Sequence, residues 1–399
     1  MKLDLSTGCL ITVSQEELDR RIGEVRRIMD EKGIGLCMAV CPMKEGWRNW
    51  LTGTDGPGRP SEGAILIGHK GDVVLVNGGS LVPRGSKGER NYAMAPALEG
   101  DGFSGYGSTE GFSADLMEEM LGGNQKIGLI GGRYLRADLY EYLKENFPEA
   151  ELLDVSEEME AIRAVKSEEE LRSLSDNARM MDKVFAGASV FVNPQKYERD
   201  IVTELRYSAY RLGCGGVDHL LSAPCELVSS KDGAAKEEGA LLYPGRKVAL
   251  GDQVSIKMFA VGNDGYFAGM SRLYVLGEPE ASTKRLWETA VEAQDYAASL
   301  LKPGAFVKDV AEAVNRFLEE RGMRKDTRTM IHGIGAAVME RPQVFEETAM
   351  PLRENMVLYV GPTVDDGVTE AVSCGDLYVI RAEGAVRLNR FPRELIRLY

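Results

Sequence analysis

The sequence lacks several features that would place it in well-defined protein classes. Nowhere in its 399 residues do about 18 apolar residues run together, as a membrane span requires, and no sustained apolar stretch follows the N-terminal lysine, as a secretory leader requires. Its six cysteines include no CxxC pair, which in a chain of this size is typical of reduced thiols rather than of a disulfide framework. These absences predict a cytoplasmic protein with no membrane partner.

Basic charge is also scarce. The 48 lysines and arginines are outnumbered by 62 aspartates and glutamates, which gives a formal net charge of −14. Such a surface repels polyanions, and no run of basic residues is interleaved with aromatic residues. We therefore expect no nucleic-acid partner.

What the sequence does contain is material for two buried cores, because 399 residues exceed what one domain usually holds and 44% of them are hydrophobic. Ser14 followed by Glu17 forms a capping box, which predicts a helix over 15–32. The remaining pattern predicts an α/β domain over residues 1–157. Its strands are expected at 34–40, 63–68, 72–77, 127–130 and 151–155, with a second helix near 134–146.

A second domain is predicted over residues 158–399. It opens with another capping box, Ser167 with Glu170, which starts a long helix. Helical periodicity recurs near 197–212, 282–301 and 306–321, with long strand runs between and after these helices.

Two turn signals bring four strand positions of this second domain together. The turn at 263–265 folds the strand 254–261 back onto 266–275, which is expected to place Lys257 and Gly269 nearly opposite each other. The turn at 365–367 is expected to bring Gly361 and Gly375 face to face.

Four segments of the second domain resemble a known family. They are GDQVSIKMFAVGNDGYFAGMSRLYVLG at 251–277, IHGIGAAVMERP at 331–342, NMVLYVGPTV at 355–364 and SCGDLYVIRAEGAVRLN at 373–389. Their order and spacing resemble the pita-bread family of methionine aminopeptidase, aminopeptidase P, prolidase and creatinase. The resemblance implies a creatinase-like α/β N-terminal domain and an α+β pita-bread C-terminal domain with a curved antiparallel sheet. It also implies a homodimer in which the N-terminal domain of one subunit reaches the site of the other.

The resemblance implies a site for two dications in the metallopeptidases of this family, but the residue types differ here. The five ligand positions fall on Lys257, Gly269, His332, Gly361 and Gly375, and only the histidine is a metal ligand. The charge of the ligand set changes from about −4 to about +1, so we expect neither a metal nor another cofactor. The three glycines are expected to leave space in which a small substrate binds.

Lys257 and His332 are the candidate catalytic residues. Burying a lysine is costly unless an acid or a substrate anion meets it, and burial would lower its pKa, which suits a general base, a Schiff-base nucleophile or a carboxylate anchor. The alternative is a lysine that reaches solvent or is neutralised by Asp376 or Glu370. His332 suits acid–base chemistry near neutral pH, and the alternative is a histidine that only holds its turn.

The other candidate substrate-binding residues belong to the same strands or to the family framework. Besides the three glycines, they are Tyr266, Ser271, Glu340, Tyr359 and Ser373. A serine beside Lys257 would form the Ser–Lys pair that some hydrolases use. Arg48, in the segment GWRNWLTG at 46–53, is a candidate to meet a carboxylate in the partner subunit's pocket; the alternative is an aromatic packing cluster.

Three functions remain open. The first is a metal-independent hydrolase or lyase that acts on the C–N bond of a small carboxylated amide, amidine or amino-acid derivative, on the scaffold that creatinase uses. The second is a catalytically inactive protein that binds a small anion or a peptide terminus. The third is an Xaa-Pro metalloaminopeptidase, which the missing ligands disfavour. The first two predict a small, anionic ligand.

Overall fold

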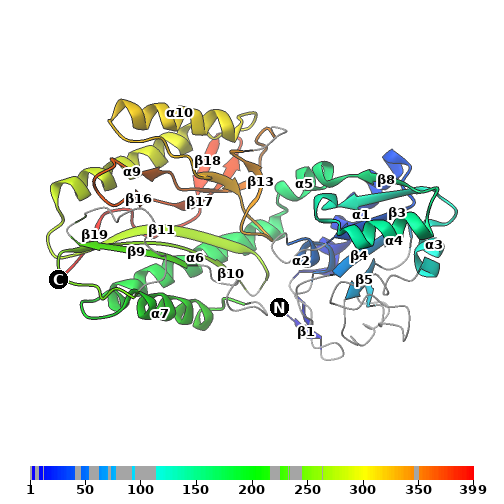
Figure 1. Cartoon of the computed structure of the whole chain (residues 1–399), viewed down its shortest axis with the longest axis horizontal. Helices are drawn as coiled ribbons and strands as arrows, with labels where there is room; N and C mark the ends of the chain where they lie inside the picture. The colour runs from blue at the N-terminus through cyan, green and yellow to red at the C-terminus, as the bar shows by residue number, and fades with distance from the viewer. Residues whose placement is uncertain are drawn as a thin grey trace. The chain divides into compact units, whose positions relative to one another are not determined.

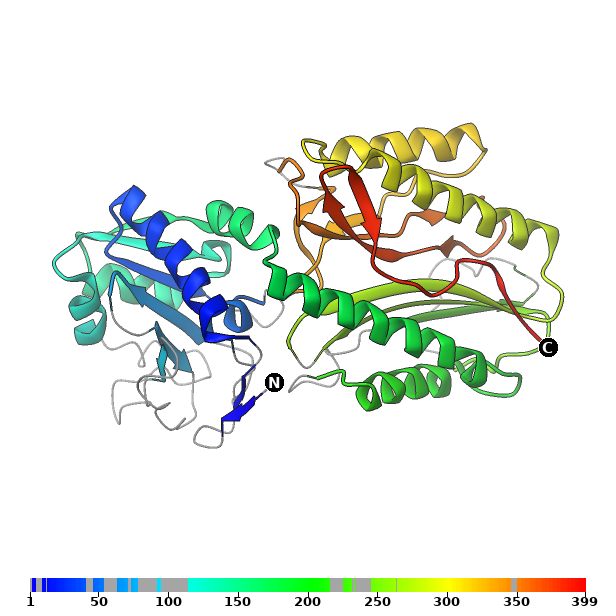
Figure 2. The same ribbon diagram turned by 180° about the vertical axis from the view of Figure 1, so that it is seen from behind.

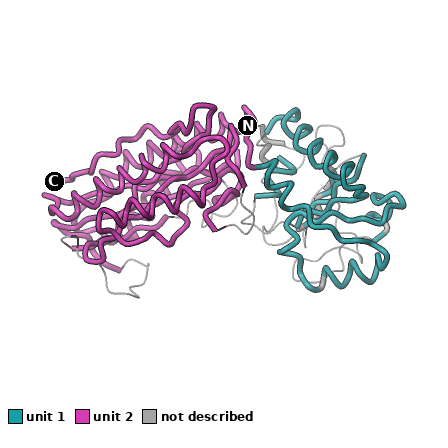
Figure 3. Tube along the Cα trace, turned by 90° about the horizontal axis from the view of Figure 1, so that it is seen from above, with its two compact units in different colours: residues 1–163 teal, residues 164–399 magenta. Residues whose placement is uncertain are grey.

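The structure is a computed structural model that describes residues 2–4, 9–11, 13–40, 46–53, 63–70, 73–77, 92–94, 114–215, 225–231, 233, 245–262, 264–345 and 350–399. It divides into two compact units, residues 1–163 and residues 164–399 (Figure 3). Within the described ranges, no helix is both long and apolar enough to cross a membrane.

Unit 1 is built on a six-stranded mixed sheet in the order β6–β5–β4–β3–β7–β8. The central strand β3 pairs antiparallel with β4 and parallel with β7. The strands span Leu36–Val40 (β3), Gly63–Gly68 (β4), Val73–Asn77 (β5), Tyr92–Met94 (β6), Lys126–Ile130 (β7) and Glu151–Asp154 (β8). A separate hairpin joins β1 (Lys2–Asp4) to β2 (Cys9–Ile11).

The helices of unit 1 are α1 (Gln15–Lys32), α2 (Trp47–Thr52), α3 (Ala114–Leu121), α4 (Ala137–Asn146) and α5 (Ser156–Ala164). The bounds predicted for α1 are confirmed, because the Ser14 hydroxyl accepts a hydrogen bond from the Glu17 N–H at 3.1 Å and Gly33 ends the helix with φ of 64°. The predicted helix at 134–146 starts too early. A 3₁₀ turn occupies Gly132–Tyr134, and α4 begins only at Ala137.

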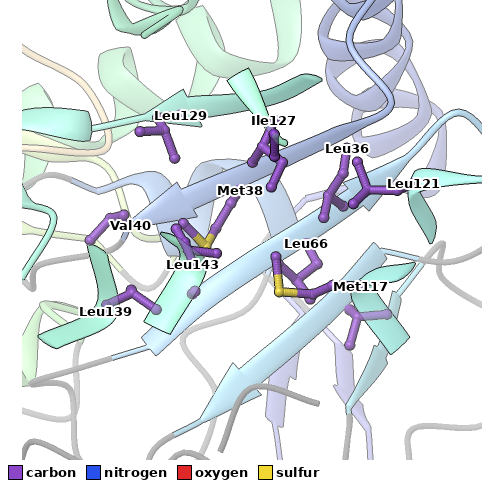
Figure 4. Packing of buried hydrophobic residues seen from close by; sticks show 13 residues of the cluster. Leu36, Met38, Val40, Leu66, Met117, Leu121, Ile127, Leu129, Leu139 and Leu143 are labelled. Carbon is purple, nitrogen blue, oxygen red and sulfur yellow. The ribbon is translucent and has the colours of Figure 1, made fainter. Parts of the chain in front are cut away.

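The core of unit 1 lies between the sheet and helices α3 and α4 (Figure 4). Side chains two apart along a strand share one face, as do side chains three or four apart along a helix, so each element contributes one apolar row. The labelled members are Leu36, Met38, Val40, Leu66, Met117, Leu121, Ile127, Leu129, Leu139 and Leu143.

Unit 2 contains two larger sheets and a short strand pair. The first sheet has the order β19–β11–β10–β9 and the second β13–β12–β14–β17–β18, while β15 pairs with β16. All these pairs are antiparallel except β11 with β19. The strands are β9 (Cys225–Lys231), β10 (Asp252–Val261), β11 (Phe267–Leu276), β12 (Ile331–Gly333), β13 (Glu340–Gln343), β14 (Val357–Val360), β15 (Thr363–Val364), β16 (Val372–Ser373), β17 (Asp376–Arg381), β18 (Gly384–Arg387) and β19 (Ile396–Leu398).

Two pairs of helices cover these sheets. Helices α6 (Glu168–Phe191) and α7 (Glu198–Arg211) run along the first sheet, and α9 (Ala281–Leu300) and α10 (Val307–Glu320) lie over the second (Figures 1 and 2). Three of these helices begin and end within one residue of the predicted bounds, and α6 starts at the predicted capping box. An α/β unit followed by an α+β unit with antiparallel sheets is therefore the observed architecture.

Candidate functional site

The β10–β11 hairpin holds two of the five positions, but not in the predicted register. Lys257 pairs with Ser271, and Gly269 pairs with Phe259. Positions 257 and 269 were expected to lie nearly opposite each other, but the direct partner of Lys257 is Ser271, and Gly269 lies two residues nearer the turn. The two positions are diagonal neighbours on one face of the hairpin, since all four residues have the same strand parity.

The second pair of positions lies as predicted. Val360 pairs with Asp376, and Thr363 pairs with Ser373 in the same register, which places Gly361 across from Gly375. Gly375 also exchanges backbone hydrogen bonds with Ser271, at 3.0 and 3.2 Å. The two large sheets of unit 2 are thus joined at the site itself.

His332 comes from β12, directly across from Tyr359 on β14. Its Nδ1 lies 2.9 Å from the Gly333 carbonyl oxygen, which can only accept, so Nδ1 carries the proton and Nε2 is the basic nitrogen. The side chain is 3% exposed. Burial, together with a smaller contribution from the positive charge of Lys257, lowers the pKa of His332 to about 4. The imidazole is therefore neutral at physiological pH.

Two aromatic rings occupy the space that the glycines were expected to leave open. A Cβ at Gly269 would lie 2.3 Å from the ring of Phe259, and a Cβ at Gly375 would lie 1.9 Å from the hydroxyl oxygen of Tyr359. At Gly361 the same hydroxyl would be 2.6 Å away. The expectation that a substrate fills this space is wrong, because the rings of Phe259 and Tyr359 already fill it.

The two rings form a packed cluster with the histidine and the lysine. The centroids of Phe259 and Tyr359 are 4.9 Å apart, and the His332 ring stacks on Tyr359 at 5.4 Å. Lys257 Nζ lies 5.5 Å from the Tyr359 centroid and 5.8 Å from that of Phe259, which is within the range of a cation–π contact. We call these four residues the aromatic cluster.

Lys257 is half-buried and turned toward these rings rather than toward a carboxylate. Asp376, one of its two expected neutralisers, is bonded instead to Arg272 at 2.7 Å. Within the described residues no acidic oxygen lies within 4.0 Å of Lys257 Nζ. Its ammonium is therefore available to a ligand on the outer side of the rings.

The Tyr359 hydroxyl is the second polar group of the cluster. It is fully buried and has no hydrogen-bond partner of good geometry in the described part of the chain, although the Ser373 hydroxyl is near enough to interact with it. Burial raises the pKa of Tyr359, so the hydroxyl stays protonated and keeps its hydrogen-bond donor.

Four other candidates have structural contacts. Glu340 accepts hydrogen bonds from Lys166 Nζ at 2.7 Å and from the backbone N–H of Ala337 at 3.1 Å, so it holds the turn after His332. The Ser271 hydroxyl donates to the Ser373 carbonyl, and the Ser373 hydroxyl donates to the Gly361 carbonyl. Tyr266 donates to Glu170 on α6 at 2.7 Å. These contacts favour a framework role for all four.

Arg48 lies on α2 in unit 1. The same helix buries Trp47 and Trp50, whose rings meet edge to face at 5.8 Å. This geometry fits the alternative reading of the segment as an aromatic packing cluster.

Sequence reasoning missed Phe259 as a site residue. Its parity along β10 is that of Lys257, and its partner across the hairpin is Gly269, so the pattern contained the signal. A large ring opposite a glycine is a common way to fill a strand pair. Sequence reasoning also missed Asp326. This side chain accepts hydrogen bonds from the N–H groups of Thr363 and Arg328, and the positive charge of Lys257 acts to lower its pKa.

The residues at the five positions do not fit a dinuclear metal centre. They offer one imidazole, and hard dications of this kind need several carboxylate or imidazole donors. In the portion of the chain that the structure describes, no group of three or more His, Cys, Asp or Glu side chains is arranged to hold a metal ion.

Because His332 is buried in its neutral form, it makes stability depend on pH. Its folded pKa of about 4 lies below the ordinary 6.5, so the unfolded chain takes up a proton first as the pH falls. Stability is full above pH 6.5 and falls by about 3 kcal/mol toward pH 4, at about 1.4 kcal/mol per pH unit. Urea unfolding at pH 7.5 and 4.5 measures this loss. The loss of stability should be smaller in His332→Gln than in the wild type, and the control His69→Gln should lose as much as the wild type. An equal loss in the wild type and both variants would contradict the role of His332.

Comparisons with known proteins agree with this architecture. The model of metallopeptidase family M24 matches residues 172–388, and the model of the creatinase/prolidase N-terminal domain matches residues 21–165. The Xaa-Pro dipeptidase of Pyrococcus horikoshii is 25% identical over 340 residues, which cover 84% of this chain and 94% of that protein. The Xaa-Pro dipeptidase of Pyrococcus furiosus is 24% identical over 283 residues, covering 71% of this chain and 78% of that one.

Solved structures show the same fold. The X-Pro aminopeptidase from Thermotoga maritima superposes with a TM-score of 0.77 at 19% identity, covering 94% of this chain and 99% of that one. The prolidase from Pyrococcus horikoshii superposes with a TM-score of 0.73 at 21% identity, covering 94% and 100%. At these identities the likeness concerns the fold.

Proposed function

Because this chain belongs to metallopeptidase family M24 and carries the creatinase/prolidase N-terminal domain, we propose that it is a metal-independent hydrolase of that family. We propose that it cleaves the C–N bond of a small carboxylated amide, amidine or amino-acid derivative. The observation that carries the proposal is the aromatic cluster. Its two rings and the Lys257 ammonium occupy the positions at which the family resemblance places carboxylates and metal ions.

The proposed ligand lies against the outer side of the cluster, where Lys257 is accessible. Its carboxylate or carbonyl oxygen meets the Lys257 ammonium, a charge-assisted contact that is stronger than a neutral hydrogen bond. The phenol of Tyr359 is buried against Gly361 and Gly375, so it holds the ring in place and does not contact the ligand. The names of the relatives suggest a dipeptide ending in proline as the first ligand to examine.

His332 is the proposed proton carrier. Its Nε2 accepts a proton from water, the resulting hydroxide adds to the carbonyl carbon, the C–N bond breaks, and the proton passes to the leaving nitrogen. Because its pKa is near 4, the imidazole is always neutral but is a weak base. We therefore expect slow turnover.

A second candidate function is binding without turnover, which one observation favours. The rings of Phe259 and Tyr359 fill the place where the family's chemistry occurs, but the Lys257 ammonium beside them can still bind a peptide terminus or a small anion. The Xaa-Pro metalloaminopeptidase activity that the relatives' names suggest would need donors that the five positions do not supply. We also propose, from the family resemblance, a homodimer with one N-terminal unit near the partner's site.

Purified protein tested against dipeptides and N-acyl amino acids separates these functions. We expect ligand binding, and slow hydrolysis, that a chelator leaves unchanged and that manganese, cobalt or zinc do not raise. Lys257→Met should weaken binding by about tenfold or more, because it removes one charged hydrogen bond, and Lys308→Met on the exposed side of α10 should not.

Each other outcome decides between the candidates. Saturable binding with no turnover supports the binding protein. Metal bound in stoichiometric amount, with activity that the chelator abolishes, contradicts metal independence. Binding that is equal in the wild type and in Lys257→Met removes Lys257 from the site.

A further inference from the structure

Lys257 has an acidic neighbour across the sheet on its other side. Strand β9 pairs antiparallel with β10, and in this register Glu226 is directly opposite Lys257, while Val228 is opposite Ser255. Residues directly opposite in an antiparallel pair point to the same face, with Cβ atoms about 5 Å apart. Glu226 therefore extends from the same face as Lys257, beside the aromatic cluster.

This face is the part of the sheet that solvent reaches. Glu226 is exposed, and Lys257, Ser255 and Val228 are half-buried, whereas Ile256 on the opposite face is fully buried. On this face, Glu226 of β9 lies beside Lys257 of β10, and Lys257 in turn contacts the rings of the aromatic cluster. A small ligand held by Lys257 lies within reach of Glu226.

The two opposite charges do not neutralise each other directly. Among the described residues, Lys257 and Glu226 form no ion pair within 4.0 Å, and the Lys257 ammonium is turned toward the rings. Asp326, which also affects Lys257 through its charge, is committed to two backbone N–H groups. Among the residues that the structure describes, Glu226 is thus the carboxylate on this face that has no ion-pair partner and can meet a ligand.

We propose that Glu226 selects ligands that carry a cationic group next to the carboxylate or carbonyl that Lys257 binds. The inference rests on the proposed function of Lys257. Its physical reason is charge complementarity: a purely anionic ligand would be attracted by Lys257 and repelled by Glu226, while a zwitterion satisfies both. Ligands of this class have an ammonium, amidinium or guanidinium group a few ångströms from a carboxylate or carbonyl.

The test compares alanyl-proline with N-acetyl-alanyl-proline, which has the same carboxylate but no cationic nitrogen. Isothermal titration calorimetry gives Kd for both ligands with the wild type, Glu226→Gln and Glu312→Gln, an exposed carboxylate of α10 that serves as control. We expect the wild type to bind the free dipeptide about tenfold more tightly than the acetylated one, the effect of one charge-assisted contact. Glu226→Gln should bring the two Kd values close together, mainly by weakening the free dipeptide, and the control should preserve the ratio.

The outcomes separate this inference from the function beneath it. Equal affinity for both ligands in the wild type, with binding still lost in Lys257→Met, overturns the role of Glu226 and leaves that of Lys257 intact. A ratio that Glu226→Gln does not change has the same meaning. Failure of both ligands to bind the wild type overturns the proposed function and this inference with it.

Discussion

Gly375→Ala is expected to lower the free energy of unfolding by about 3 kcal/mol, a large effect for one methyl group. The new Cβ would lie 1.9 Å from the Tyr359 hydroxyl oxygen and 2.5 Å from its Cζ, distances that real Cβ atoms do not show. Either the ring must leave its place between His332 and Phe259 or the strands must separate, and overpacking of this kind costs about 1–3 kcal/mol or more.

Urea unfolding of a double-mutant cycle identifies the cause. Tyr359→Ala alone should cost about 3–5 kcal/mol, because it removes a buried ring. In that background Gly375→Ala should cost only about 0.5 kcal/mol, so that the two effects are strongly non-additive. Gly245→Ala is the control, since nothing lies within 4 Å of the Cβ it would add. Additive effects at Gly375 and Tyr359 would show that the ring does not fill this space.

The same crowding limits substitution at the three glycines. Introducing a carboxylate at Gly375, Gly361 or Gly269 requires that Tyr359 or Phe259 become smaller at the same time, because each added Cβ meets one of these rings. Single substitutions toward the metallopeptidase pattern are therefore expected to destabilise the fold before any metal can bind. The three glycines and the two rings are therefore expected to tolerate substitution only in combination.

Helix ends were predictable from the sequence because the forces that set them are local. A capping hydroxyl acts within three residues of the first turn, so Ser14 and Ser167 each placed a helix start correctly. The start of α4 was placed three residues too early, because Tyr134 belongs to a 3₁₀ turn and the regular helix begins only after Arg136. Pairing of β19 with β11 joins segments about 120 residues apart, and no local pattern predicts it.

The strand positions of the candidate residues could be predicted from the sequence, but the packing around them could not. The pattern identified Lys257, His332 and the facing glycines, because these depend on motif spacing and on strand parity. It could not place the rings of Phe259 and Tyr359, since a side chain's rotamer is fixed by neighbours from other strands. The turn at 263–265 was predicted from the sequence, but the register puts Ser271, not Gly269, directly opposite Lys257.

Arg272→Met is expected to be the most destabilising substitution beside the site, at about 3–5 kcal/mol. Arg272 and Asp376 are both fully buried and are joined at 2.7 Å. The guanidinium also donates to the carbonyl oxygens of Gly375 and Pro392, at 3.0 and 2.8 Å, so it ties β11 to β17 and to the C-terminal segment. Methionine has a similar volume but leaves the Asp376 carboxylate buried without its main partner. It also removes one hydrogen bond from each of the two carbonyl groups, of which that of Gly375 keeps the bond from the Ser271 N–H.

Removing the Asp376 carboxylate as well should recover part of the stability that Arg272→Met loses. We expect the double variant Arg272→Met/Asp376→Leu to be more stable than Arg272→Met, because a buried apolar pair costs less than a buried charge without its partner. Recovery should be incomplete, since Gln294 also donates to Asp376 at 3.1 Å and would lose that bond. Urea unfolding measures all three proteins, with Arg316→Met on the exposed side of α10 as a control within about 0.5 kcal/mol of the wild type. A double variant less stable than Arg272→Met would mean that Asp376 is stabilised mainly by groups other than Arg272, and that the connection between β11 and β17 depends on the backbone bonds at Gly375 instead.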